Sequence, residues 1–284
     1  MSSTRASLAE VEPRVGIALS GGGARGIAHI GVLKALLEHG IVPSVVAGTS
    51  SGAIVGCLYA YGMSVEQMTD FARIGSSLRI LRIGNPLKGF MKLTMLREKL
   101  EGLLSHDDFS CLVREFHVVT SDLQHGRVAV HTSGSLIDVV QASCAIPLVF
   151  RPIELNGVQH VDGGLYMNLP ANPVRGRVDV LIGSNVMPLV NEVEGPLSTM
   201  LGIGQRVFDL SVNATTAPSA ALCDVLIEPA EVARFNVYNF TRTEELIEAG
   251  YQAGLLEVPR VKALIAKRRT ERQKTSTRQS SAGS

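Results

Sequence analysis

Cysteine is scarce in this sequence, which has four among 284 residues. The four stand far apart and form no Cys-x-x-Cys pair, at positions Cys57, Cys111, Cys144 and Cys223. Structural zinc sites need closely spaced pairs of ligands, so this spacing argues against zinc. We expect buried, reduced thiols, as in a protein of the cytosol.

An excess of either charge is also lacking, because 27 basic residues face 26 acidic ones and the net charge is +1. This balance gives no reason to expect a nucleic-acid partner. The C-terminal segment 267–284 has six basic residues against Glu271 alone, a net charge of +5, which leaves −4 for the remainder. Its polar composition without apolar periodicity predicts a disordered tail, and a binding arm is the alternative.

The first 13 residues lack an apolar run and contain Arg5, Glu10 and Glu12. We therefore expect no secretory signal and a cytoplasmic protein, with peripheral contact at the inner face of the membrane left open. Ile41–Val65 has no charged residue and is long enough to span a bilayer. Its proline and glycines favour instead a buried strand, a sharp turn and a buried helix.

Hydrophobic residues make up 45% of the chain and charged residues 19%, which is typical of a globular protein. Two similar units stand near the N-terminus. In the first, the apolar run Arg14–Leu19 is followed by a glycine-rich turn and a helical pattern that ends at His39. In the second, the apolar run Ile41–Ala47 is followed by a second glycine-containing turn and a predicted helix over about 51–61. This alternation predicts an α/β fold with three layers (α/β/α) and a mostly parallel central sheet. We expect one domain over residues 14–266, between a flexible N-terminus (1–13) and the tail.

Later apolar runs predict further elements. The dipeptide Asn156-Gly157, preferred in type I′ turns, joins two short runs of Pro152–Val161 into a hairpin. This hairpin leads directly into Asp162-Gly163-Gly164. Strands are also expected over 116–120, 128–131, 178–185 and 225–227, and helices over 136–144 and 244–266.

Residues 48–52 have the pattern Gly-x-Ser-x-Gly between a predicted strand and a predicted helix. A serine at this position sits on a sharp turn with its hydroxyl exposed, and the glycines avoid clashes. The amide of Ser51 and the positive end of the following helix favour negative charge that develops there. The context predicts a nucleophile at Ser50, and a turn without catalysis is the alternative.

A second glycine-rich turn, residues 20–26, reads SGGGARG. The spacing Gly-x-Gly-x-x-Gly within it matches the dinucleotide-binding fingerprint, which requires an acid at the end of the next strand. Residues 41–48 contain no acid. We therefore interpret the turn as an oxyanion site, with the amides of Gly22 and Gly23 as donors and Arg25 as a nearby cation.

No histidine stands in a glycine-rich turn late in the chain, where the partner of a catalytic serine is expected. We therefore expect surface or packing roles for all seven histidines. Asp162, at the end of the hairpin and before two glycines, is better placed. A partly buried carboxylate with a raised pKa can accept the serine proton. Alone, however, Asp-Gly-Gly is most often only a turn.

The three motifs SGGGARG, GTSSG and DGG follow one another in this order. Together they resemble the patatin-like phospholipase family, above all its small bacterial members. The resemblance runs from about Arg14 to Ala266 and takes in TSDLQHGR, ASCAIPLVF and DVLIEP. It implies Ser50 as nucleophile and Asp162 as base. The expected oxyanion site comprises Gly21, Gly22, Gly23, Arg25, Gly26 and Ser51, and the motif glycines are Gly48, Gly52, Gly163 and Gly164.

The family includes phospholipases A, lysophospholipases, neutral lipases and members with no known substrate, so the resemblance implies a mechanism better than a substrate. We expect hydrolysis of a lipid carboxylic ester through an acyl-enzyme, without metal or cofactor. A regulatory or scaffolding protein with little turnover is the alternative, and nucleotide binding ranks last. Leu78–Met95 mixes apolar and basic residues without an acid, which suits the rim of a lipid pocket at an anionic membrane or an ordinary cap. The sequence says nothing about oligomers.

Overall fold

One mixed sheet forms the centre of the computed structural model, which describes residues 12–77, 86–188 and 199–282. Its strand order is β5-β6-β3-β2-β1-β7-β8, and β4 pairs with β3. The five strands from β3 to β8 in this order run parallel, and the pairs β3–β4, β3–β6 and β5–β6 are antiparallel. The strands are β1 Val15–Leu19, β2 Val45–Thr49, β3 Glu115–Asp122, β4 Arg127–His131, β5 Ile153–Leu155, β6 Val158–Asp162, β7 Val180–Ser184 and β8 Val225–Ile227.

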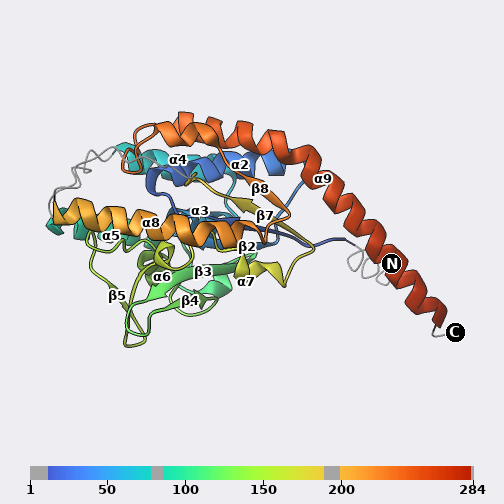
Figure 1. The fold of residues 1–284 in the computed structure, drawn as a ribbon, viewed down its shortest axis with the longest axis horizontal. Helices are drawn as coiled ribbons and strands as arrows, with labels where there is room; N and C mark the ends of the chain where they lie inside the picture. The colour runs from blue at the N-terminus through green and yellow to red at the C-terminus, as the bar shows by residue number, and fades with distance from the viewer. Residues whose placement is uncertain (1–11, 78–85, 189–198, 283–284) are drawn as a thin grey trace.

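Helices cover both faces of this sheet (Figure 1). Alternation along the strands separates two cores: Ile17 and Leu19 pack with α2, α3 and α9, whereas Ala18 packs on the opposite face with α7 and the end of α8. The predicted three-layer α/β fold is therefore confirmed. The helices are α2 Ala28–Glu38, α3 Ser51–Tyr61, α4 Val65–Ser77, α5 Pro86–Glu101, α6 Leu136–Ser143, α7 Asn172–Arg175, α8 Met200–Ala220 and α9 Thr243–Ala282, with 3-10 turns η1 Gly23–Ile27, η2 Phe109–Cys111, η3 Gly163–Leu165 and η4 Ala230–Arg234.

The strand register brings three distant loops to one edge of the sheet. Leu19 of β1 lies opposite Gly48 of β2, so the turns that follow these parallel strands are neighbours. Thr49 lies opposite Val119 of β3, and the next residue of β3, Thr120, pairs with Asp162. The ends of β1, β2 and β6 thus meet at the carboxyl edge, where α/β proteins bind ligands.

The predicted hairpin and the predicted strand–turn–helix at Ile41–Val65 are both present. Asn156 and Gly157 have φ angles of 52° and 80°, the pair of positive values that a type I′ turn requires. The uncharged run forms β2, a turn and α3. No helix in the described ranges is both long and apolar enough to cross a bilayer.

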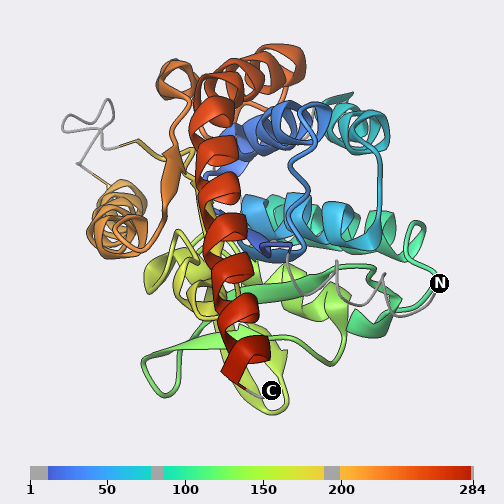
Figure 2. The ribbon, with the colours of Figure 1, turned by 90° about the vertical axis from the view of Figure 1, so that its right-hand side faces the viewer.

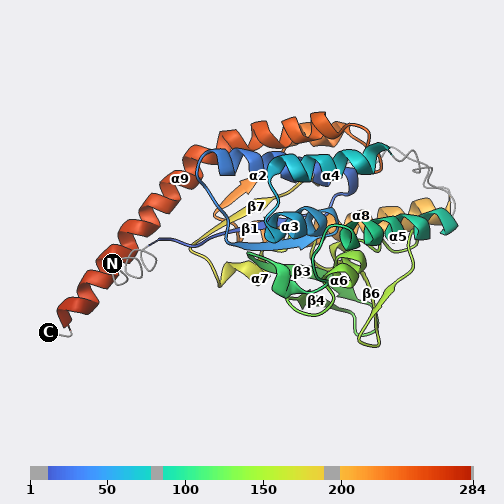
Figure 3. The same cartoon turned by 180° about the vertical axis from the view of Figure 1, so that it is seen from behind.

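Two helices differ from the sequence-based expectation. The helix α8 had no predicted counterpart, and Figure 2 views it end-on at the outer edge of the molecule. The helix α9 lies beside α2 (Figure 3) and continues to Ala282, through most of the tail expected to be disordered. Two ion pairs join this part of the helix to acids far away in the sequence: Arg269 contacts Glu12 at 2.8 Å and Arg272 contacts Asp179 at 3.0 Å. All four cysteines are free thiols; Cys57 and Cys144 are buried, and Cys111 and Cys223 are half-buried.

Candidate active site

Ser50 occupies a strained turn between β2 and α3. Its φ of 53° and ψ of −124° are uncommon for a residue with a side chain. The flanking glycines permit the turn, because a Cβ on Gly52 would collide with the carbonyl of Leu19. The hydroxyl of Ser143 links this turn to β3. It accepts a hydrogen bond from the Ser50 amide at 2.8 Å and donates one to the Val119 carbonyl at 2.7 Å.

Asp162 ends β6 and faces this serine. Its side chain is buried and accepts a hydrogen bond from the Gly164 amide at 2.8 Å, and the Ser50 hydroxyl lies close enough to influence its pKa. Burial raises the pKa of Asp162 to about 7, although the Ser50 hydroxyl and the Gly164 amide act in the opposite direction. A carboxyl group with this pKa can act as a general base near neutral pH.

The raised pKa of Asp162 has a consequence for stability. The native carboxyl keeps its proton up to about pH 7, whereas the unfolded chain loses it near pH 4, so native stability falls as the pH rises through this window. Asp162→Asn removes the titration. The difference in the free energy of unfolding, variant minus native protein, is therefore expected to increase by about 1.4 kcal/mol for each pH unit between about pH 4 and 7. Urea unfolding at pH 5, 6, 7 and 8 measures this, and a difference that stays constant over pH would contradict it.

The glycine-rich turn lies directly against Ser50 and Ser51. A Cβ on Gly21 would lie 3.1 Å from the Ser50 Cβ, and one on Gly26 would collide with the Ser51 hydroxyl. The Gly21 amide donates to the Asn168 carbonyl at 3.1 Å. Among the described residues, the amides of Gly22 and Gly23 donate to no protein acceptor. Their predicted role as donors to an oxyanion at Ser50 stays a prediction.

Arg25 extends away from this turn to the segment around η4. Its Nε donates to the Phe235 carbonyl at 2.8 Å and its Nη2 to the Ala233 carbonyl at 3.0 Å. Burial lowers the Arg25 pKa, and the charge of Asp209 opposes this effect. The guanidinium thus ties the turn to a segment more than 200 residues away along the chain. Direct contact between Arg25 and an oxyanion stays a prediction.

Sequence reasoning missed His29, which supports the glycine-rich turn from inside the core. Its ring is fully buried between the Ser20 carbonyl at Nε2 (2.9 Å) and the Ser184 hydroxyl at Nδ1 (2.8 Å). Burial lowers the pKa of His29 to about 4, so the ring is neutral at physiological pH and donates from Nε2 to the carbonyl. Among the described residues, no histidine is hydrogen-bonded to Ser50.

Asn168 was also missed. Its carbonyl holds the Gly21 amide, and its Oδ1 lies close to both Gly21 and Gly164. Its buried Nδ2 has no hydrogen-bond partner among the described residues. The signals for His29, Ser143 and Asn168 are contacts between residues far apart in sequence, which no local pattern displays.

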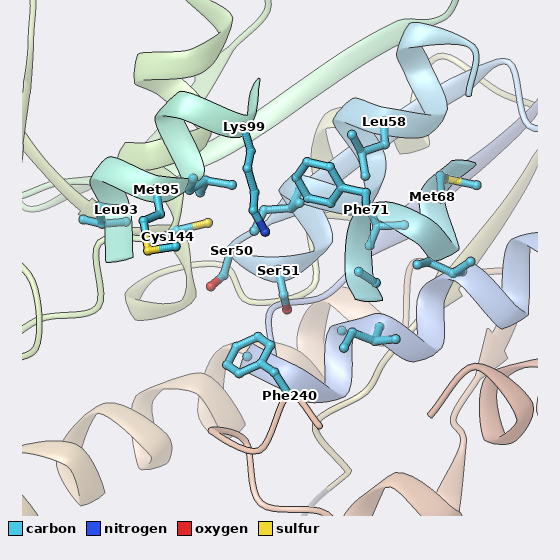
Figure 4. A pocket seen from close by; sticks show the side chains of 18 of the residues that line it. Ser50, Ser51, Leu58, Met68, Phe71, Leu93, Met95, Lys99, Cys144 and Phe240 are labelled. Carbon is cyan, nitrogen blue, oxygen red and sulfur yellow. The ribbon is translucent and has the colours of Figure 1, made fainter. Parts of the chain in front are cut away.

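An apolar cavity of about 260 Å³ opens beside Ser50 (Figure 4). Its walls come from α3, α4 and α5, from η1, and from the loop that follows α6. Aliphatic and aromatic side chains dominate the lining, among them Leu58, Phe71, Leu96, Phe150 and Phe240. A cavity of this character suits a hydrocarbon chain whose carbonyl carbon lies at the serine. No cluster of three or more potential metal ligands occurs in the described ranges.

The structure is thus an α/β protein in which Ser50 and Asp162 lie at neighbouring strand ends beside an apolar cavity. The chain belongs to the patatin-like phospholipase family, whose model matches residues 17–175. An uncharacterized NTE family protein of Mycobacterium tuberculosis is 30% identical over 266 residues, which cover 84% of this chain and 45% of that protein. Lysophospholipase nte1 of Aspergillus fumigatus is 33% identical over 179 residues, 61% of this chain and 12% of that protein. The chain therefore spans less than half the length of these relatives.

Solved structures agree with this family at the level of the fold. Human GIVD cytosolic phospholipase A2, in complex with methyl gamma-linolenyl fluorophosphonate, has a TM-score of 0.53 to this chain at 13% identity. The alignment covers 93% of this chain and 60% of that one.

Proposed function

We propose that the chain is a serine hydrolase that cleaves carboxylic esters of lipids. The observation that carries this proposal is the approach of the Ser50 hydroxyl to a buried Asp162 with a pKa raised to about 7, beside an apolar cavity that Ser50 lines. The family supports a lipid ester, and the relative named lysophospholipase supports a lysophospholipid in particular.

The geometry supports a mechanism in two halves. Asp162 takes the proton of the Ser50 hydroxyl while the Ser50 oxygen attacks the ester carbonyl carbon. The amides of Gly22, Gly23 and Ser51 stabilise the tetrahedral oxyanion. The protonated Asp162 then gives its proton to the leaving alcohol, which leaves an acyl-enzyme. A water molecule that loses its proton to Asp162 attacks this ester. Asp162 then returns the proton to the Ser50 oxygen as the fatty acid leaves, which restores both groups.

Covalent labelling by a fluorophosphonate tests this function against the regulatory or scaffolding alternative. An activated Ser50 displaces fluoride and becomes phosphonylated, whereas an unactivated hydroxyl does not react. We expect the native protein and Ser44→Ala, a serine at the opposite end of β2 from Ser50, to be labelled equally. Ser50→Ala should not be labelled, and mass spectrometry should place the adduct on Ser50. A native protein that stays unlabelled would favour the alternative.

Peripheral contact with a membrane is part of the same proposal. The segment first considered for it, Leu78–Met95, is described only in part: residues 78–85 and the side chains of Arg79, Arg82, Lys88 and Lys92 lie outside the described structure. The helix α8 offers a second surface. The exposed side chains described on it are all uncharged and apolar, and the large ones follow helical spacing: Met200, Ile203, Val207 and Leu210, exposed by 84, 44, 60 and 50%.

This apolar row is continuous with the cavity loop. Leu148 is 65% exposed and lies against Gly204 of α8, and the same loop supplies Ile146 and Phe150 to the cavity. A lipid surface seated on α8 would therefore lie beside the loop that lines the site. Helices that pair with each other usually have charged residues beside their apolar row, and these charges set the register. Such charges are sparse on α8, so a helix of a second protein is a less suitable partner for this row than a lipid surface.

A double substitution in this row is expected to weaken binding to liposomes. Val207→Glu with Leu210→Glu replaces two exposed apolar side chains by charges, so the fraction that sediments with phosphatidylglycerol-containing liposomes should fall about tenfold or more. Val113→Glu is the matched control, because Val113 is 69% exposed elsewhere on the surface. Unchanged sedimentation of the double variant would contradict membrane contact through α8. A change in its oligomeric mass would point to a dimer instead.

A further inference from the structure

Among the described residues that line the cavity, Lys99 of α5 is the only charged one. Its ammonium group lies 5.5 Å from the centre of the Phe71 ring, a cation–π contact. In Figure 4 the side chain enters the cavity and points toward the turn that carries Ser50 and Ser51. A positive charge therefore lies at a mainly apolar cavity and faces the turn that carries Ser50.

This charge has no acidic partner in the described part of the chain. Its neighbour on α5, Arg97, pairs with Glu101 at 3.2 Å and with Asp138. Lys99 makes no ion pair or hydrogen bond with any described residue. Partial burial lowers the Lys99 pKa, which reflects the cost of keeping an ammonium group away from water. A bound anion would remove this cost.

A second unpaired donor lies in the same cavity. The hydroxyl of Ser51 is buried, and no described residue hydrogen-bonds it. A buried hydroxyl without a partner is unfavourable, so an occupant of the cavity is expected to supply an acceptor. Lys99 and Ser51 together present an ammonium group and a hydroxyl, a set that suits an anion with several oxygens.

We propose that Lys99 and the Ser51 hydroxyl form a site for the phosphate group of the lipid, so that the cavity selects phospholipids or lysophospholipids over neutral glycerides. This inference rests on the proposed function. A neutral glyceride contains only hydrocarbon, ester and hydroxyl groups. A phospholipid or lysophospholipid also contains a phosphodiester, which carries a fixed negative charge. A glyceride would leave the Lys99 charge uncompensated. The phosphate thus sets which lipids bind, while Ser50 and Asp162 carry out the reaction.

Binding of two matched ether lipids tests the site without turnover. A short-chain 1-O-alkyl glycerol phosphate and the corresponding 1-O-alkyl glycerol share the chain and the glycerol, and neither contains an ester. Titration calorimetry below their micelle concentrations should show that the native protein binds the phosphate about tenfold more tightly, a difference of about 1.4 kcal/mol. Lys99→Met should abolish this preference without weakening the neutral lipid, and Lys99→Arg should retain most of it.

Lys34→Met provides a matched control, because the Lys34 ammonium makes a similar cation–π contact, 4.6 Å from the centre of the Tyr251 ring, and Lys34 is not among the described residues that line the cavity. It should bind both lipids like the native protein. Equal native affinities for the two lipids would overturn the inference, as would a Lys99→Met variant that weakens both equally. Hydrolysis is scored separately: a native phosphate preference without cleavage of any lipid ester would sink the proposed function and leave the phosphate site standing.

Discussion

Ser50→Ala and Asp162→Asn are each expected to lower kcat/KM for a short-chain nitrophenyl ester about ten-thousand-fold or more. Alanine at position 50 lacks the attacking oxygen, and asparagine at position 162 cannot accept the proton of the Ser50 hydroxyl. The Ser50 hydroxyl influences the pKa of the Asp162 carboxyl, and among the described residues no histidine is hydrogen-bonded to Ser50. Losses of this size are typical when a nucleophile or its base is removed.

Two matched variants separate this loss from misfolding. Ser44→Ala and Asp179→Asn change the same residue types at the amino ends of β2 and β7, at the opposite edge of the sheet from the site. Both should keep near-native turnover. Melting temperatures of all four variants show whether each is folded. A folded Asp162→Asn variant with more than a tenth of native kcat/KM would refute Asp162 as the base.

The pH dependence of native turnover is expected to follow the Asp162 carboxyl. Its pKa is raised to about 7 by burial, and only the ionised form accepts the serine proton. kcat/KM should therefore rise about tenfold per pH unit up to about pH 7 and level off above it. Turnover at pH 5 should be about a hundredfold below the plateau.

Initial rates in a series of buffers from pH 5 to 9 measure this profile. Asp179→Asn should reproduce the native curve, because Asp179 lies at the far end of the sheet beside Arg272. An inflection near pH 4, the ordinary value for an aspartate, would show that the carboxyl at work is not buried as the structure describes.

The local parts of the site could be predicted from the sequence. Ser50 and Asp162 stand in short motifs whose glycines are visible in the chain, and each motif follows a recognisable strand. The structure brings these two residues together through the register Thr49–Val119 and Thr120–Asp162. The dipeptide Asn156-Gly157 likewise predicts a type I′ turn, and the positive φ angles of both residues agree with that turn type.

The remaining parts depend on contacts that no short window contains. Ser143 holds the Ser50 amide across 93 positions of the chain, and Arg25 reaches a carbonyl 210 positions away. The helix α8 contains Pro218 and many small residues, so its composition does not favour a helix. The basic tail likewise contacts Glu12 and Asp179, which lie far away in the sequence.

The most direct test of the account is a double-mutant cycle on kcat/KM with Ser50→Ala, Asp162→Asn and their combination. A hydroxyl and a carboxyl that work as one unit predict three folded variants with the same residual rate, because removing the second group costs nothing further. Two losses that multiply in the double variant would mean that the groups act separately, and the paired site described here would be wrong.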